Sequence, residues 1–194
     1  MPADERRQSI LDAALTVFAI EGYTGTTTAR VACSAGVSEP ILYRHFPSKQ
    51  VMLRALLDET ITRMMVAFHG LVEGEIDPVA ALCRICRAYP ELSHRFQREF
   101  RFINQALVEV NDSKTREILA AHYHAYHAFL RKLIEKGQRK GTLRRDISAA
   151  TGAWHIIHSA LGFLMTENIR PDAWSSKDFE PLMDATLNGL MKTA

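Results

Sequence analysis

The chain has 194 residues and a mass of 21.9 kDa, with 47% hydrophobic and 24% charged residues and a formal net charge of +2. This size and composition are typical of a soluble globular protein with one or two modest domains. A net charge so close to zero excludes a protein that binds polyanions through bulk charge, so any nucleic-acid binding must come from a local basic patch.

The N-terminus and the cysteines indicate the compartment. The opening residues, MPADERRQSI, lack the apolar stretch of a signal peptide, and no later apolar run is long enough to span a bilayer. We therefore expect a cytoplasmic protein with no membrane partner. The three cysteines, Cys33, Cys83 and Cys86, are an odd number without the spacing of a disulfide framework. We expect buried, reduced thiols.

Apolar residues fall at helical spacing along almost the whole chain, which predicts an all-α protein of about nine helices. A first helix is expected over residues 5–20, with Gly22 placed to end it. Thr26 or Thr27 then caps a short helix, and Gly36 breaks it.

Two serines mark the next two helices. Ser38 is expected to cap a second short helix, which carries Pro40 in its first turn and is ended by Pro47. Ser48 then caps a long helix over residues 48–72, whose apolar residues recur at spacings of three and four. This helix is long enough to connect two parts of the molecule.

Prolines and polar breaks divide the second half of the chain. Pro90 is expected to end one helix and separate it from the next, because proline lacks the N–H that an inner turn needs. The remaining helices are predicted over residues 78–88, 91–109, 114–140 and 151–166, and over an apolar face from Phe179 to Leu190.

The two short helices form a candidate helix-turn-helix. Ala32 and Gly36 are small enough for the helices to cross closely at a steep angle. In the second helix, Leu42 and Phe46 provide the core side. The outward face then holds hydroxyl and cationic donors where a phosphate backbone would lie, and a plain helical hairpin with a solvated polar face is the alternative. This face comprises Glu39, Pro40, Tyr43, Arg44 and His45, with Lys49 just beyond.

The stretch GTTTARVACSAGVSEPILYRHFPSKQVML resembles the DNA-binding domain of the tetracycline-repressor (TetR) family of transcriptional regulators. The matching pattern is Thr-Thr, apolar-Ala, Ala-Gly-Val-Ser, Leu-Tyr, His-Phe and then Lys. The resemblance implies a helix-turn-helix DNA-binding domain over residues 1–47. It also implies a helical domain over residues 48–194 that binds a small ligand and forms a homodimer through its last two helices.

The same resemblance implies roles for single residues. Phosphate contacts are expected from Thr27 at the helix start and from Tyr43, His45 and Lys49, and Thr28 is a further DNA-binding candidate. Reading of base edges is expected from Ser38, Glu39, Pro40 and Arg44. Arg44 is the strongest candidate, because a guanidinium fork can pair with guanine O6 and N7 in the major groove. Glu39 could instead cap its helix and repel phosphate.

Two positions depart from the family pattern. Pro40 stands where the family often has glycine, and Ile41 stands where a small hydroxyl residue or alanine is usual. The resemblance therefore does not carry one phosphate or thymine contact over to Ile41.

The nearly all-apolar stretch AWHIIHSALGFLM needs more cover than one small core supplies. Pairing with a second copy provides that cover, and a twofold dimer matches a palindromic operator with half-sites about 34 Å apart. A purely internal core helix is the alternative. The candidate dimer residues are Ile157, Leu161, Leu164, Leu182, Thr186, Leu187 and Leu190.

Aromatic residues and histidines suggest an apolar ligand pocket with polar handles. Core filling is the competing interpretation for any one of them. The candidates are Met64, Phe68, Phe96, Phe100, Tyr123, Tyr126, His127, Trp154 and His158. The histidines have no carboxylate or thiol tied to them by spacing, and the Cys-x-x-Cys pair at Cys83 and Cys86 lacks two further ligands, so no metal site is expected.

These features predict a ligand-responsive transcriptional repressor that a small, largely apolar molecule releases from a palindromic operator. No nucleophile and base recur at catalytic spacing, and no glycine-rich phosphate loop is present, so neither an enzyme nor a cofactor is expected. A constitutive DNA-binding protein without an effector and an all-α enzyme remain the alternatives.

Overall fold

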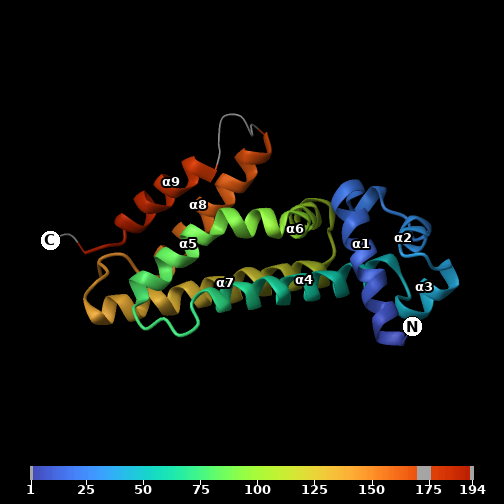
Figure 1. The fold of residues 1–194 in the computed structure, drawn as a ribbon, viewed down its shortest axis with the longest axis horizontal. Coiled ribbons are helices and arrows are strands. Elements are labelled where there is room, and N and C mark those ends of the chain that lie inside the picture. Colours follow the sequence, from blue (N-terminus) through green and yellow to red (C-terminus); the bar gives the residue numbers. More distant parts are fainter. Residues whose placement is uncertain (1, 170–175, 193–194) are drawn as a thin grey trace. The chain divides into compact units, whose positions relative to one another are not determined.

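The computed structural model describes residues 2–169 and 176–192. Over these ranges the chain forms nine α-helices, which confirms the predicted all-α fold (Figure 1). None of the described helices is long and apolar enough to cross a membrane. The helices are α1 (Ala3–Gly25), α2 (Thr28–Ser34), α3 (Glu39–His45), α4 (Lys49–Leu71), α5 (Pro78–Arg95), α6 (Gln97–Glu109), α7 (Ser113–Lys140), α8 (Ala149–Ile169) and α9 (Ser176–Asn188).

The chain divides into two compact units. The first holds Met1–Met64 and Phe96–His122, and the second holds Met65–Arg95 and Tyr123–Ala194. Helices α4 and α7 each contribute one end to each unit, whereas α1, α2, α3 and α6 belong to the first unit alone.

Helix α1 buries an apolar stripe that includes Ile10, Leu11 and Phe18. Gly22 interrupts the helix with a φ of 72°, a left-handed conformation that suits glycine, and a last turn then continues to Gly25. The regular helix therefore stops at Gly22, as the sequence predicts, and one further turn beyond this kink extends α1 to Gly25.

The turn between α2 and α3 has the predicted chemistry with one exception. Thr27 caps α2, because its hydroxyl accepts a hydrogen bond from the N–H of Arg30 at 3.2 Å. Gly36 has a φ of 65° in the turn. Ser38 occupies the N-cap position of α3, but its side chain makes no capping hydrogen bond. The expected Ser38 cap is therefore wrong, and Pro40 supplies the favourable first-turn geometry.

Helix α4 begins as predicted. The hydroxyl of Ser48 accepts a hydrogen bond from the N–H of Val51 at 3.1 Å, which satisfies one donor of the first turn. Its inward residues Met52, Leu53, Leu56 and Leu57 are almost completely buried.

The expected helix break at Pro90 is wrong, because α5 continues through this residue. The helix runs through this proline from Pro78 to Arg95, and α6 begins at Gln97 rather than at residue 91. A proline inside a helix costs about 3 kcal/mol. Burial of Tyr89 and Leu92 on either side of Pro90 offsets that cost, and this tertiary contribution is not visible in the local sequence.

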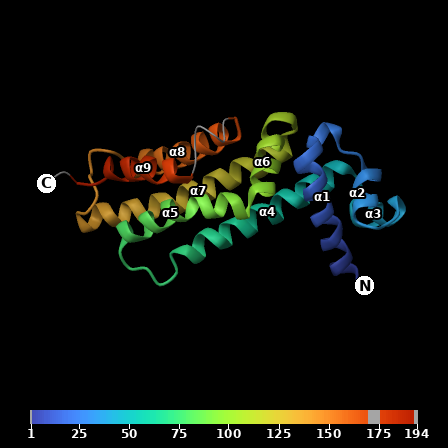
Figure 2. The same cartoon turned by 45° about the horizontal axis from the view of Figure 1, so that its top comes forward.

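In the second unit, α9 packs against both α5 and α8 (Figure 2). Phe179 of α9 is fully buried between these neighbours. Its ring stacks on Tyr89 of α5 with centroids 5.0 Å apart, and it meets Phe163 of α8 edge-on at 4.6 Å. An aromatic cluster therefore joins α5, α8 and α9 within the core of this unit.

The cysteines differ from the expectation of three buried thiols. Cys86 is buried, Cys83 is half-buried and Cys33 is exposed on α2. All three are free thiols. Cys33 is exposed because the buried face of this seven-residue helix is limited to Val31 and Ala32.

Candidate nucleic-acid interface

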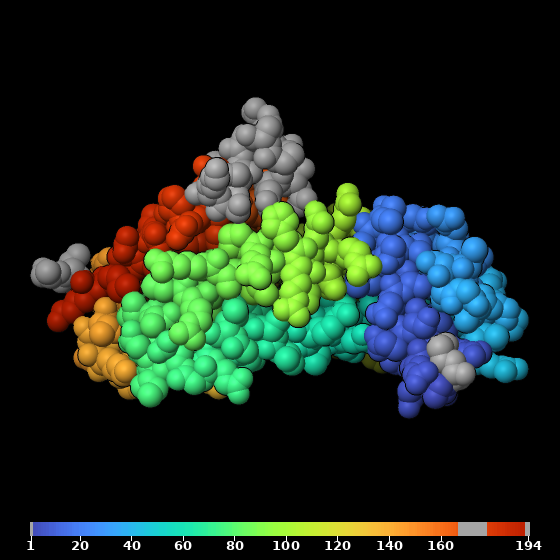
Figure 3. Space-filling view, viewed as in Figure 1, coloured from blue at the N-terminus to red at the C-terminus, as the bar shows by residue number. Residues whose placement is uncertain are grey.

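Helix α3 presents a polar face on an apolar anchor. Leu42 and Phe46 are buried, whereas Tyr43 and Arg44 are exposed. Figure 3 shows α2 and α3, in light blue, at the surface of the first unit. A seven-residue helix is too short to be stable alone, so these two anchors hold it in place. The exposed side chains are thereby supported by a rigid element.

A hydrogen-bonded group links the starts of α2 and α3. The Thr28 hydroxyl lies 3.3 Å from Glu39 Oε1 and 3.0 Å from the Tyr43 hydroxyl. Thr28 and Glu39 are half-buried, and Tyr43 is 44% exposed. Three of the predicted DNA-contact residues are therefore already bonded to one another.

Lys49 is held at the start of α4. Its ammonium donates to the carbonyl oxygens of Tyr23 at 2.7 Å and Thr26 at 2.8 Å, and it lies 4.3 Å from the centroid of the Tyr23 ring. An ammonium has three donors, so one N–H is left for a phosphate. Lys49 therefore ties the start of α4 to the last turn of α1 and to Thr26 just after it.

The other predicted contact residues lie on the same two helices. Thr27 and Ser38 are exposed at the helix starts, Pro40 is exposed in the first turn of α3, and His45 is half-buried at its end. Arg44 has no hydrogen-bond or ion-pair partner within residues 2–169 and 176–192, so its guanidinium group is available to a ligand.

Arg7 is a candidate that sequence reasoning missed. Its guanidinium carbon lies 5.1 Å from the centroid of the Phe46 ring, so this exposed cation from α1 stands beside the end of α3. No local signal connects Arg7 with a residue so much later in the chain.

Helix α6 supports the back of α1. The Arg98 guanidinium donates to the Thr16 hydroxyl at 3.1 Å, and Phe102 packs against Phe18 with ring centroids 5.8 Å apart. At the end of α6, Glu109 accepts a hydrogen bond from the N–H of Thr24 at 2.9 Å. The helix-turn-helix is thus supported along the length of α1.

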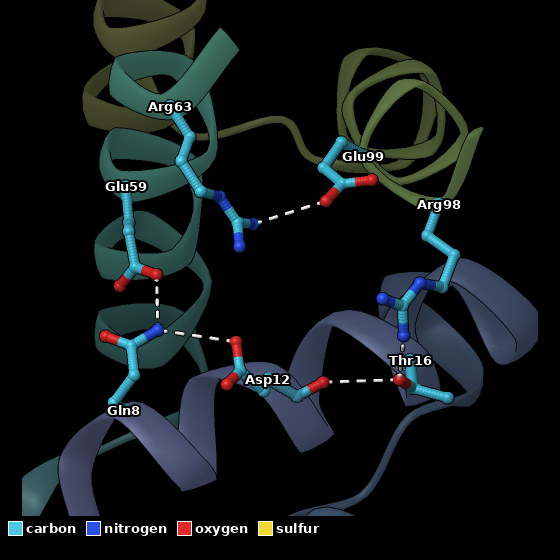
Figure 4. A network of polar contacts seen from close by, with 7 residues as sticks. All are labelled: Gln8, Asp12, Thr16, Glu59, Arg63, Arg98 and Glu99. Carbon is cyan, nitrogen blue, oxygen red and sulfur yellow. Dashed lines mark hydrogen bonds and ion pairs between the residues drawn. The ribbon is translucent and has the colours of Figure 1, made fainter. Parts of the chain in front are cut away.

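Polar contacts join α4 to α1 and α6 (Figure 4). Gln8 on α1 donates to Glu59 on α4 at 2.5 Å, and Arg63 on α4 pairs with the buried Glu99 of α6 at 3.3 Å. A shift of α4 along its axis would disturb both contacts.

Asp112, the residue just before α7, connects the start of that helix to α4 within the first unit. Its carboxylate accepts hydrogen bonds from the Thr115 hydroxyl at 2.6 Å and from the Arg54 guanidinium at 2.8 Å. These bonds, first that of Thr115, lower the pKa of the Asp112 carboxyl well below its usual range. The Asp112 carboxylate therefore stays ionised, and paired with Arg54, at acidic pH values at which an ordinary aspartate becomes protonated.

The candidate pocket residues fall into both units. Met64, Phe96 and Phe100 belong to the first unit, and the other six belong to the second. Within the second unit, Phe68 and Tyr126 are in ring contact at 4.7 Å. Burial raises the pKa of the Tyr126 hydroxyl well above 10, so this group stays protonated.

Two histidines of the second unit stack on Trp154. Trp154 lies between His127, at 4.8 Å, and His158, at 5.4 Å, and His127 Nε2 lies 3.0 Å from the carbonyl oxygen of Ala150. His155 and His158 are both exposed. Among the described residues, no group of three or more histidine, cysteine or acidic side chains is arranged to hold a metal ion.

Most of the candidate dimer residues are covered within one chain. Ile157, Leu164, Thr186, Leu187 and Leu190 are buried, whereas Leu161 and Leu182 are half-buried. The exposed face of α8 instead carries His155, His158, Gly162 and Met165, the last of which is 63% exposed.

These features define a helix-turn-helix protein with a second helical unit, and comparisons with known proteins agree. The protein-family model for "Bacterial regulatory proteins, tetR family" matches residues 10–56 of this sequence. The nucleoid occlusion factor SlmA of Enterobacter sp. (strain 638) is 30% identical over 138 residues, which cover 70% of each chain. The chain belongs to the TetR family, and it is therefore a DNA-binding transcriptional regulator and not an enzyme.

Other similar proteins differ in their regulatory role. The transcriptional repressor AcnR of Corynebacterium diphtheriae is 31% identical over 118 residues, covering 54% of this chain and 62% of AcnR. The transcriptional activator FasR of Mycolicibacterium smegmatis is 40% identical over 121 residues, covering 62% of this chain and 53% of FasR. The chain thus spans about half to two thirds of these two relatives.

A solved structure shows the same fold over nearly the whole chain. It is the complex of SmeT with triclosan, which has a TM-score of 0.80 at 21% identity and covers 97% of this chain and 92% of SmeT.

Proposed function

We propose that the protein is a repressor that binds a palindromic operator as a homodimer and is released by a small, largely apolar molecule. The observation that carries the DNA-binding part is the two-sided α3, in which Leu42 and Phe46 are buried and Tyr43 and Arg44 are presented to solvent. Residues 1–47 would bind DNA, and residues 48–194 would bind the effector and form the dimer.

The contacts divide into two kinds. Thr27, Thr28, Tyr43, His45 and Lys49 would bind phosphates, and Ser38, Glu39, Pro40 and Arg44 would face the base edges. Arg44 is the proposed reader, because its guanidinium group is exposed and has no partner in the described chain. Phosphate contacts set position and overall affinity, whereas base contacts set sequence preference.

The effector would bind among the aromatic residues of the helical part. The contact between Phe68 on α4 and Tyr126 on α7 supports this, because an apolar ligand that moves either ring would also move a helix that extends into the first unit. The SmeT structure is described as a complex with the small molecule triclosan. A ligand releases DNA only to the extent that it prefers the conformation that does not bind DNA.

The dimer would use α8 and α9. Leu161 and Leu182 are half-buried, and Met165 is an exposed apolar side chain on α8 that a partner could cover. A twofold dimer presents two copies of α3, which suits a palindrome with half-sites about 34 Å apart.

Selection of duplexes from a random pool tests the proposal. We expect a palindromic sequence to be enriched, and addition of cell extract or of an apolar effector to weaken binding. Arg44→Ala should relax the preference at one base pair, by about 1–3 kcal/mol per mismatch. A uniform loss of affinity for Arg44→Ala would remove this residue from the base readers.

Two controls sharpen this test. Lys49→Ala should weaken binding to all sequences and reduce the salt slope by about one phosphate contact. Arg131→Ala removes an exposed cation of α7 in the second unit and should leave DNA binding unchanged. AcnR is a repressor and FasR is an activator, so a promoter fused to a reporter gene must show whether this protein represses or activates transcription. Higher reporter expression in the presence of the protein would overturn the proposed repression.

A further inference from the structure

We propose that Glu39 weakens the phosphate contact of Tyr43, because it keeps the hydroxyl hydrogen of Tyr43 on Thr28. The inference rests on the proposed function, in which Tyr43 binds a DNA phosphate. It gives Glu39 a positioning role in addition to its place beside the base edges: Glu39 acts through Thr28 on Tyr43.

The geometry is a chain of three groups. Glu39 Oε1 lies 3.3 Å from the Thr28 hydroxyl oxygen, which lies 3.0 Å from the Tyr43 hydroxyl oxygen. The carboxylate and the threonine are half-buried, whereas the tyrosine reaches the surface. The chain therefore runs from a sheltered anion outward to the face that would meet DNA.

The number of available hydrogens determines which group donates in each of these hydrogen bonds. An ionised carboxylate only accepts hydrogen bonds, and each hydroxyl supplies one hydrogen. The hydrogen of Thr28 goes to Glu39, so the contact between the two hydroxyls is a hydrogen bond only when Tyr43 is its donor. In the free protein, Tyr43 thus donates inward and turns a lone pair outward.

A phosphate at Tyr43 adds a third contact but no hydrogen. The hydroxyls of Thr28 and Tyr43 then lie between the Glu39 carboxylate and the phosphate. They have two hydrogens for three contacts, so in one contact two oxygen atoms face each other without a hydrogen between them. Tyr43 must either give up Thr28 or fail to donate to the phosphate. Loss of one hydrogen bond corresponds to about threefold to tenfold in affinity.

Replacement of the carboxylate by an amide restores the count. In Glu39→Gln, the side-chain N–H donates to Thr28, Thr28 donates to Tyr43, and Tyr43 donates to the phosphate. Three hydrogens then serve three contacts, and bonds in such a chain strengthen one another. The same substitution also removes a negative charge, which by itself favours DNA, so the test must separate the two effects.

A double-mutant cycle separates them. Wild type, Glu39→Gln, Tyr43→Phe and the double variant are titrated by fluorescence anisotropy against the duplex that wild type selects, at several salt concentrations. The charge effect is the same with or without the Tyr43 hydroxyl. We expect the gain from Glu39→Gln to be about threefold to tenfold smaller in the Tyr43→Phe background. Equal gains in both backgrounds would overturn the inference.

Two further variants serve as controls. Glu21→Gln removes the same charge from the first unit at a residue that pairs with Arg30 instead, so its effect should not depend on the Tyr43 hydroxyl. Thr28→Val removes the middle hydroxyl, and in this background the part of the Glu39→Gln gain that depends on Tyr43 should vanish. If the Tyr43-dependent gain persisted in the Thr28→Val background, the proposed link from Glu39 through Thr28 to Tyr43 would be wrong.

Thermal unfolding monitored by circular dichroism verifies that each variant is folded. If folded wild type selects no duplex at all, the proposed function fails and the inference fails with it. If wild type binds and the cycle is additive, only the role of Glu39 fails, and the proposed DNA-binding face stands.

Discussion

The Glu109 carboxylate accepts a hydrogen bond from the N–H of Thr24 and fills the space where a side chain at Gly22 would stand. Gly22 has a positive φ, so this residue meets two demands at once: a left-handed backbone and a close approach by α6. The kink in α1 is therefore a docking point for α6 as well as a turn.

Gly22→Ala should destabilise the protein more than Gly36→Ala. Both glycines have positive φ, but a β carbon at Gly36 meets nothing within 4 Å, whereas one at Gly22 meets Glu109. We expect Gly36→Ala to lower the free energy of unfolding by about 1 kcal/mol. Gly22→Ala should cost up to about 1 kcal/mol more, because the Glu109 carboxylate must move and weaken its hydrogen bond to Thr24. Urea denaturation measures both, and equal losses would show that the Glu109 contact costs nothing to displace.

Thr60→Val should stabilise the protein. Thr60 is fully buried on α4, and its hydroxyl has no hydrogen-bond partner in the part of the chain that the structure describes. Valine has nearly the same shape without the unmet polar group, so we expect a gain of about 1 kcal/mol.

Thr115→Val is the matched control for Thr60→Val. Thr115 is equally buried, but its hydroxyl donates to Asp112 at 2.6 Å, so the same substitution should cost about 1 kcal/mol. Calorimetric melting distinguishes the two signs. A loss of stability in both variants would mean that the Thr60 hydroxyl has a partner.

Asp112→Asn should lower the stability at neutral pH and have little effect in acid. The pKa of the Asp112 carboxyl is lowered in the folded protein, so its ionised form stabilises the fold above the unfolded-state value of about 3.9. This contribution is lost as the pH falls through the folded pKa. We expect a deficit of about 1–2 kcal/mol at pH 7 that shrinks below about pH 4.

Asp77→Asn provides the comparison for Asp112. Asp77 caps α5 by accepting a hydrogen bond from the N–H of Ala80 at 3.2 Å, without an ion-pair partner among the described residues. The loss in Asp77→Asn should be smaller, because asparagine caps helices nearly as well as aspartate. Chemical denaturation between pH 3 and pH 7 tests this difference, and parallel curves for the two variants would contradict the role of Arg54.

The three thiols should react in a fixed order. Cys33 is exposed, whereas burial raises the pKa of Cys83 and raises that of Cys86 to about 12. Because the thiolate is the reactive form, a disulfide reagent at pH 8 should modify Cys33 first, Cys83 more slowly and Cys86 only on unfolding. Peptide mass spectrometry with Cys33→Ser as control would show the order, and early labelling of Cys86 would contradict its burial.

Local signals predicted most of the recognition region, although the side chain of Ser38 does not cap α3 as expected. Thr27, Gly36 and Ser48 act through their nearest neighbours in sequence, so the turn and the helix starts could be predicted from residue type. The outward position of Tyr43 and Arg44 followed from helical spacing against Leu42 and Phe46.

Contacts between distant segments were not predictable in this way. Pro90 stays inside α5 because tertiary burial outweighs its local cost. The bonds of Lys49 to Tyr23 and Thr26 and the position of Arg7 on Phe46 depend on how α1 crosses the later helices. Residue type alone identified Lys49 as a cation near DNA but not as a link between α4 and α1.

The contacts of α6 with α1 limit how this regulator can be re-engineered. A chimera joined after residue 47 would carry a foreign recognition helix and leave Phe102 and Glu109 facing an α1 that did not evolve with them. A graft meant to change operator choice should therefore take Gln97–Glu109 from the same donor as α1. The transplantable piece is discontinuous in sequence although it is continuous in space.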